Sequence, residues 1–258
     1  MSLATRLKRH WFAVDAHFDR VVALSFAFPE EVVRPVVPSA LTLDTHNGFA
    51  FVTVAMVWTR AFRPTGFPAI LGQSFFLAGY RVFTKFQEPI GRRLRGLNIL
   101  RSYTDQRRMV HLGNLLTAYH YQHVKVRERR SGDAYAVDIH NRRGERTLDI
   151  AFTMPDGEVA LPSGSPFATW SEARRFAGPR PFTCSAENAS NIVVIEGSRQ
   201  HWEPRPIAVS SWTVSLFDEA PFRSVTPVLA NAFAVEGVDY HWKRGRVVAV
   251  AQSQLLDR

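Results

Sequence analysis

The chain is poor in several residue types that mark particular classes of protein. It has one cysteine, Cys184, so it can form no internal disulfide and nothing indicates secretion. We interpret Cys184 as a small, half-buried strand residue, because the surrounding PFTCSAEN gives no sign of a lowered thiol pKa. No run of about 18 apolar residues occurs, so we expect no membrane-spanning helix and no membrane partner. The basic N-terminus lacks the apolar region of a signal peptide, which favours a cytoplasmic location.

Lysine is also scarce, although the chain is strongly basic. Only Lys8, Lys85, Lys125 and Lys243 are lysines among 32 basic residues, and the formal net charge is +9 with a pI of about 10.3. Arginine is the better partner for planar anions such as carboxylates and phosphates. A basic surface also makes nucleic acid an alternative partner. The arginine clusters, however, recur at predicted hairpin tips and lack interleaved aromatics, so the sequence disfavours nucleic-acid binding.

The common catalytic and nucleotide-binding motifs are missing. No Gly-x-Ser-x-Gly, P-loop, His-Glu-x-x-His or dinucleotide fingerprint is present. His120 and His123 have an odd spacing, which sends their side chains to opposite faces of a strand and disfavours a shared metal ion. We therefore predict no metal site and no cofactor.

The composition supports a packed core along the whole chain. Of 258 residues, 46% are hydrophobic and 21% charged, and 19 are phenylalanine. No linker or repeat interrupts the pattern, so we expect one domain, residues 1–258. About ten strands with two or three short helices predict a mainly β, α+β fold. An antiparallel β-barrel-like domain is the natural way to remove so many sheet edges.

Strand signals recur along the chain at short intervals. The segment 49–58 is apolar on both faces, so we expect it to be covered on both sides. Helices are predicted after Pro29 and over 165–176, the latter with Ser165 as its N-cap. The predicted strands are 20–28, 49–58, 73–86, 119–130, 135–141, 148–154, 182–186, 191–197, 207–217, 225–234, 238–243 and 246–251.

The segment 91–126 holds the densest mixture of charged, amide, histidine and tyrosine residues. It predicts a strand, a turn, a short helical or irregular piece and a second strand. In the last strand, Tyr119, Tyr121 and Lys125 share one face, which is either a solvated exterior or a polar pocket wall. A buried Arg101 would need an acidic partner or a ligand, and Asp105 is the nearest candidate acid.

These patterns resemble a known group of proteins. A strand followed by Pro29 to Asp44, then Asn-Gly-x-Ala-x-Val-x-Val, is similar to the opening of the YqjF-like bacterial proteins. The segments YRVFT, RGLNILRS and GNLLTAYHY extend the likeness over most of residues 11–155. That uncharacterised family is placed in the acetoacetate decarboxylase-like superfamily. The resemblance implies a single β-barrel-like domain with a central cavity, and its decarboxylases use a buried Schiff-base lysine.

The sequence departs from the decarboxylase pattern at the reacting groups. The resemblance would place the lysine near Tyr119 to Gln122, where there is none, and an acid near Leu77 to Gly79, where there is none. Lys125 is the only nearby substitute. The resemblance therefore implies the fold and a cavity, without the expected Schiff-base chemistry.

Our first hypothesis is a cavity that binds a small organic anion. An arginine would hold a carboxylate bidentately, and tyrosines would supply hydroxyl donors. The predicted ligand-binding residues are Arg81, Asn98, Arg101, Asn114, Tyr119 and Tyr121. A second hypothesis is a decarboxylase or lyase acting on a keto acid, with Lys125, His111 or Tyr121 as catalytic groups. A third is an interaction or nucleic-acid-binding protein that uses its basic surface. A homo-oligomer is possible in each case.

Overall fold

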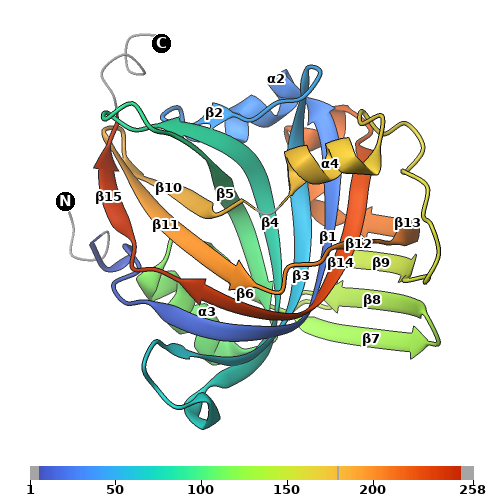
Figure 1. Cartoon of the computed structure of the whole chain (residues 1–258), viewed down its shortest axis with the longest axis horizontal. Coiled ribbons are helices and arrows are strands. Elements are labelled where there is room, and N and C mark those ends of the chain that lie inside the picture. Colours follow the sequence, from blue (N-terminus) through green and yellow to red (C-terminus); the bar gives the residue numbers. More distant parts are fainter. Residues whose placement is uncertain (1–5, 179, 251–258) are drawn as a thin grey trace.

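The computed structural model describes residues 6–178 and 180–250, and strands dominate it (Figure 1). The strands are β1 (Val14–Pro29), β2 (Thr42–Leu43), β3 (Phe49–Pro64), β4 (Gln73–Gln87), β5 (Arg93–Thr104), β6 (Tyr121–His123), β7 (Lys125–Ser131), β8 (Ala134–His140), β9 (Arg146–Thr153), β10 (Phe182–Asn188), β11 (Asn191–Gln200), β12 (Arg205–Pro206), β13 (Ala208–Val214), β14 (Val228–Trp242) and β15 (Arg246–Ala249). The α-helices are α2 (Glu30–Val33), α3 (Arg107–Leu116) and α4 (Trp170–Ala177). Short 3-10 turns cover Arg34–Val36, Ala69–Leu71, Ser215–Asp218 and Phe222–Ser224. The mainly β prediction is therefore confirmed.

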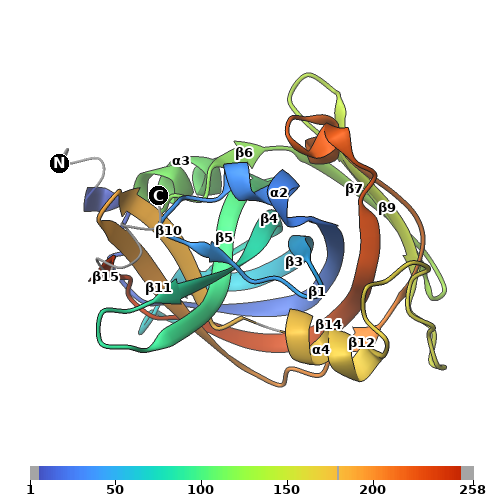
Figure 2. The same ribbon diagram turned by 90° about the horizontal axis from the view of Figure 1, so that it is seen from above.

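Eleven strands form one sheet that closes into a ring. The path runs β14, β1, β3, β4, β5, β10 and β11, and β11 pairs again with β14. Most neighbours are antiparallel, but β5 pairs in parallel with β6 at one end and with β10 at the other. Figure 2 shows this ring of strands from above. The ring gives the large sheet an inner and an outer face.

A second sheet, in the order β13, β9, β8 and β7, covers the outer face of part of the ring. It lies beside β1, β3 and β14 at the right of Figure 1. Outward residues such as Leu24, Val54 and Tyr80 pack against Ile150 and Phe152 in the largest apolar cluster. The two-sided burial predicted for 49–58 is confirmed, because one face of β3 meets this sheet and the other lines the ring interior.

Two helices close parts of the ring interior. Ala173 and Ala177 of α4 pack with Phe51 and Phe83 in a second apolar cluster. The helix α3 packs through Met109 against the strand β6 that follows it. The predicted order of strand, helical piece and strand in 91–126 is confirmed by β5, α3 and β6.

Some predicted boundaries are wrong. The helix predicted over 165–176 begins at Trp170, and Thr169 caps it by accepting from the Glu172 N–H at 3.1 Å. The Ser165 hydroxyl instead donates to the Ala230 carbonyl at 2.7 Å. A local capping signal could not distinguish these two hydroxyls, because the choice depends on how the preceding loop docks on β14.

Other differences come from sheet partners. The predicted strand 119–130 divides at Val124, so β6 joins the large sheet and β7 the small one. The segments 225–234 and 238–243 are one strand, β14, with Gly237 at a φ of 66°. The end of the predicted strand 246–251 lies outside the described residues. No helix within the described ranges is long and apolar enough to cross a membrane.

Candidate functional site

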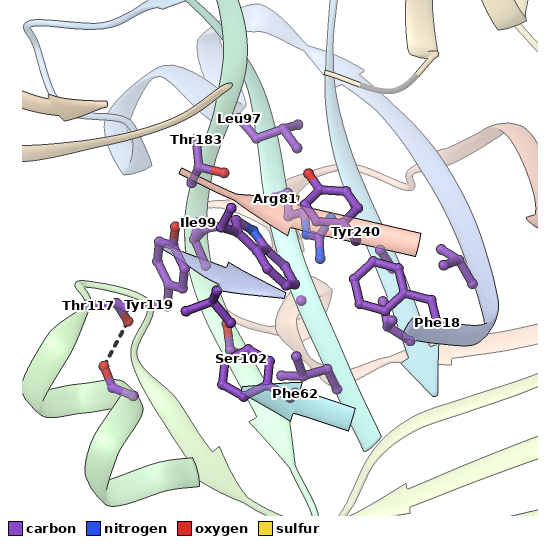
Figure 3. A pocket seen from close by; sticks show the side chains of 18 of the residues that line it. Phe18, Phe62, Arg81, Leu97, Ile99, Ser102, Thr117, Tyr119, Thr183 and Tyr240 are labelled. Atoms are coloured by element: carbon purple, nitrogen blue, oxygen red, sulfur yellow. Dashed lines mark hydrogen bonds between the residues drawn. The ribbon is translucent and has the colours of Figure 1, made fainter. Parts of the chain in front are cut away.

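The interior of the ring contains a pocket of about 320 Å³ (Figure 3). Inward side chains of β1, β3, β4 and β5 make its walls, because residues two apart on a strand face the same side. The exposed residues Trp11, Phe12, Leu71 and Leu112 also line it. Its mouth therefore lies between the N-terminal segment, the β3–β4 connection and α3. Apolar wall residues include Phe18, Val21, Val57, Phe62, Leu77, Phe83, Leu97, Ile99 and Met109.

The charged groups of the pocket are all of one sign. Among the described residues that line it, none is Asp, Glu or Lys. Its titratable side chains are Arg63, Arg81, Arg180, Arg199, His10, Tyr119, Tyr121 and Tyr240. Guanidinium groups stay protonated at any physiological pH. The pocket is therefore cationic and largely apolar.

Arg81 lies in the strand wall of the pocket and is half-buried. It lies in the middle of β4, and its neighbours two residues away, Gly79 and Phe83, also line the pocket. Within the described part of the chain, Arg81 makes no ion pair, and its buried Nε has no hydrogen-bond partner. A Cβ atom at Gly79 would lie 2.9 Å from that Nε, so glycine makes room for the side chain. Burial lowers the pKa of Arg81, which remains a cation because its ordinary value is so high.

Three tyrosines surround this guanidinium. Figure 3 shows Tyr240 beside Arg81, and Tyr119 near Ile99 and Thr183. Tyr121 follows Tyr119 at the start of β6. Burial raises the pKa of Tyr119, Tyr121 and Tyr240. Each phenol therefore keeps its proton at physiological pH and can donate a hydrogen bond to a ligand.

Close contacts fix the positions of two of these tyrosines, Tyr121 beside α3 and Tyr240 beside β11. Asn114 of α3 holds the backbone of Tyr121 on both sides: its Nδ2 donates to the Tyr121 carbonyl at 2.9 Å, and its Oδ1 accepts from the Tyr121 N–H at 2.7 Å. A Cβ atom at Gly113 would lie 2.4 Å from the Tyr121 ring. At Gly197 of β11, a Cβ atom would lie 2.1 Å from the Tyr240 hydroxyl oxygen. Glycine at these positions lets both rings seat against the backbone.

The predicted ligand-binding residues divide into two groups. Arg81, Tyr119 and Tyr121 line the same pocket. Asn98 is buried and donates to the Cys184 carbonyl at 3.0 Å, so it does not line the pocket. Asn114 acts through the backbone of Tyr121, as described above.

Arg101 also lies outside the pocket lining. It makes a two-pronged ion pair with Glu219, with both N–O distances at 2.8 Å, and contacts the Tyr103 hydroxyl at 3.3 Å. The prediction that Asp105 is its partner is wrong, because Asp105 accepts a hydrogen bond from the Phe76 N–H at 2.9 Å. The true partner lies 118 positions away in sequence.

The groups suggested for catalysis are also separated. Lys125 is exposed at the start of β7 in the second sheet, and His111 is exposed on α3. Neither lines the pocket, whereas Tyr121 does. Cys184 is fully buried rather than half-buried, and burial raises the pKa of its thiol to about 12. Among the described residues, no three His, Cys, Asp or Glu side chains gather as metal ligands do.

Several pocket residues had no signal in the sequence. Arg180, Arg199 and Tyr240 come from the C-terminal third of the chain and meet Arg81 only through the ring of strands. Arg199 lies opposite Tyr240 across the β11–β14 pairing, which closes the ring. Only the alternation of Tyr240 and Trp242 on β14 hinted at an inward aromatic face.

The fold is shared with several solved enzymes of low sequence identity. An acetoacetate decarboxylase-like enzyme from Sphingomonas wittichii RW1 matches with a TM-score of 0.62 and 10% identity, over 95% of each chain. Acetoacetate decarboxylase from Legionella pneumophila matches with a TM-score of 0.62 and 10% identity, over 91% of this chain and 87% of that one. The enduracididine biosynthesis enzyme MppR matches with a TM-score of 0.61 and 12% identity, over 92% and 89%. These likenesses establish the fold, as the resemblance implied.

No curated protein is similar to this sequence at a significant level. One family model does match, over residues 15–239, and that family is described as an uncharacterized conserved protein. The match covers the pocket-forming strands β1 to β11 and most of β14. This chain, whose fold is like that of acetoacetate decarboxylase, therefore belongs to the DUF2071 family.

Proposed function

We propose that this protein binds a small organic carboxylate inside the ring of strands, with Arg81 as the anchor for the carboxylate. In this proposal, residues 1–258 act as one domain, and the ring serves as a barrel-like container for the ligand. The observation that carries it is the charge inventory: arginines line the pocket, and no described lining residue is acidic.

The state of Arg81 gives the physical argument. Arg81 is half-buried in the pocket wall, which removes part of its hydration, and no carboxylate of the described lining residues replaces that water. A ligand carboxylate would form charge-assisted hydrogen bonds with the part of the guanidinium that faces the pocket. The tyrosine hydroxyls add neutral donors to the same space. The apolar walls favour a ligand with a hydrocarbon or aromatic part.

A keto acid is one candidate within this class. MppR, which has this fold, has been described in complex with pyruvate, with a TM-score of 0.58 and 12% identity to this chain. A keto acid could bind here without covalent chemistry. Schiff-base formation requires an amine in the cavity, and the described pocket lining contains no lysine.

Thermal-shift and calorimetric titrations with a panel of carboxylic acids test the proposal. The panel would contain pyruvate, butyrate, hexanoate and benzoate, with the corresponding primary amides as uncharged controls. A ligand at about 100 times its Kd stabilises the folded state by about 2.7 kcal/mol, enough to raise Tm by several degrees. We expect acids, and not their amides, to raise Tm.

The variant Arg81→Met tests the anchor. We expect it to lose at least about tenfold in affinity for every acid that binds, the scale of one charge-assisted hydrogen bond. The matched control is Arg60→Met, since Arg60 is exposed and pairs with Asp19 at the surface. Acid binding that survives in Arg81→Met at full strength would contradict the proposed anchor. Borohydride trapping with pyruvate, which we expect to leave the protein unmodified, tests the covalent alternative.

A further inference from the structure

We infer that the pocket takes a ligand with two anionic groups, a linear dicarboxylate, and that Arg180 binds the second carboxylate. This inference rests on the proposed function of the pocket and names the chemical class of its ligand.

Arg180 is a second guanidinium facing the same space. It follows α4, lines the pocket, and is only 8% exposed. Its Nε is buried without a hydrogen-bond partner, as the Nε of Arg81 is. Burial lowers the pKa of Arg180 to about 10, so it is still a cation at neutral pH. Two arginines of one pocket thus each have a buried N–H group that lacks an acceptor.

The charges around Arg180 leave room for an additional anion. Asp44, only 2% exposed, is the shared carboxylate of three cations. Its oxygens lie 2.9 Å from Arg180 Nη2, 3.2 Å from Lys85 Nζ and 2.7 Å from Arg95 Nε. One negative charge faces three positive ones, so two positive charges remain uncompensated within this cluster. Lys85 and Arg95 are partly exposed to solvent, whereas Arg180 is not.

A purely structural role does not account for the whole side chain of Arg180. Its Nη2 donates to the Phe176 carbonyl in the last turn of α4 as well as to Asp44. The guanidinium also lies over the rings of Phe83 and Phe176, at 5.1 and 5.3 Å from their centroids. These contacts orient the group and use Nη2, but they leave the Nε without an acceptor.

Phe83 is a neighbour of both arginines. Arg81 and Phe83 are two residues apart on β4, which separates their Cα atoms by about 7 Å along the strand. The Arg180 guanidinium lies over the Phe83 ring, at 5.1 Å from its centroid. Phe83 and the apolar Leu97 both line the pocket. A dicarboxylate could place its methylene groups against these residues and one carboxylate at each arginine.

Calorimetric titration of matched acids tests the inference. Succinate, glutarate and adipate would be compared with butyrate, valerate and hexanoate, which have the same carbon number and one carboxylate less. We expect wild-type protein to bind at least one diacid tenfold or more tightly than its matched monoacid. Arg180→Met should weaken diacid binding by tenfold or more and so remove the preference, whereas the surface control Arg60→Met should keep it. Arg81→Met should weaken the binding of diacids and monoacids alike.

The possible results distinguish failure of the second anion site from failure of the proposed carboxylate binding. If monoacids bind through Arg81 but diacids bind no better, the second anion site is refuted and the proposed function stands. If no acid of either kind binds to the wild type, both are refuted. Asp44 keeps Lys85 and Arg95 in Arg180→Met, and the Tm of the variant checks that the fold is intact. Lysine keeps the positive charge but lacks the paired N–H donors of a guanidinium. Arg180→Lys should therefore recover part of the diacid preference if Arg180 binds the second carboxylate.

Discussion

Arg81 has a stability cost as well as a proposed role. Its side chain is half-buried with an inaccessible Nε, and no acidic residue among the described lining residues compensates the charge. Burying a charge without a partner opposes folding. Proteins tolerate such costs at functional sites, where stability and activity compete.

Arg81→Met should therefore stabilise the ligand-free protein. Methionine fills much of the same volume without a charge, so we expect the free energy of unfolding to rise by about 1 kcal/mol and Tm by about 2–4 °C. Thermal unfolding followed by circular dichroism measures this. Arg60→Met should leave Tm nearly unchanged, because exposed ion pairs contribute little. A lower Tm in Arg81→Met would show that the side chain has a structural partner in the folded protein.

At the scale of elements, α3 and β6 behave as one unit that places Tyr121. The helix α3 precedes β6, and β6 pairs in parallel with β5 over three residue pairs. Such a short strand has few backbone hydrogen bonds of its own. Asn114 supplies two side-chain contacts to the Tyr121 backbone that take the place of a longer ladder.

Asn114→Ala should loosen this unit. Removing the amide leaves the Tyr121 N–H and carbonyl without their partners, a loss of about 1–3 kcal/mol in the free energy of unfolding. Urea denaturation measures the change. Leu115→Ala is the matched control, since Leu115 is exposed on the same helix. Because Tyr121 lines the pocket, we also expect weaker acid binding in Asn114→Ala. Equal stability of the two variants would contradict the role assigned to Asn114.

At the scale of the whole molecule, His10 joins three distant parts of the chain. Its N–H donates to the Leu116 carbonyl at 3.1 Å, its carbonyl accepts from the Gly245 N–H at 2.9 Å, and its ring Nδ1 lies 3.2 Å from the Lys243 carbonyl. It therefore ties the N-terminal segment to the end of α3 and to the β14–β15 connection. Burial lowers the pKa of His10.

This lowered pKa predicts a loss of stability in acid. As the pH falls below about 6.5, the unfolded histidine gains a proton while the folded one resists it. The unfolded state then binds more protons, so the free energy of unfolding decreases until the pH reaches the folded pKa. Urea unfolding between pH 7.5 and 5 measures the slope, and we expect His10→Gln to reduce it.

The slope should be reduced rather than abolished in that variant. Burial also lowers the pKa of His123, helped by Arg107 and Arg142, and that group contributes in the same direction. His111→Gln, at an exposed position of α3, is the matched control for the substitution itself. A His10→Gln slope as steep as the wild type would mean that His10 is not the group responsible.

The elements of this fold were predictable because their signals are local. The apolar segment 49–58 predicted the start of β3, which continues to Pro64, and its two apolar faces predicted burial on both sides. The predicted strand 73–86 matches β4 almost to its end at Gln87. The strand pattern failed at Val124, where β6 ends and the chain passes to the other sheet. A strand pattern gives no information on which sheet a strand joins.

The sequence by itself determined a mainly β chain, a scarcity of lysine and an excess of arginine. Only the tertiary structure decided which arginines line the pocket. Arg101 forms an ion pair with Glu219, whereas Arg81 and Arg180 line one pocket, and each has a buried Nε without an acceptor. The reason is physical: the state of a charged side chain depends on partners brought near by the closure of the ring. Glu219, the partner of Arg101, lies 118 positions away in sequence.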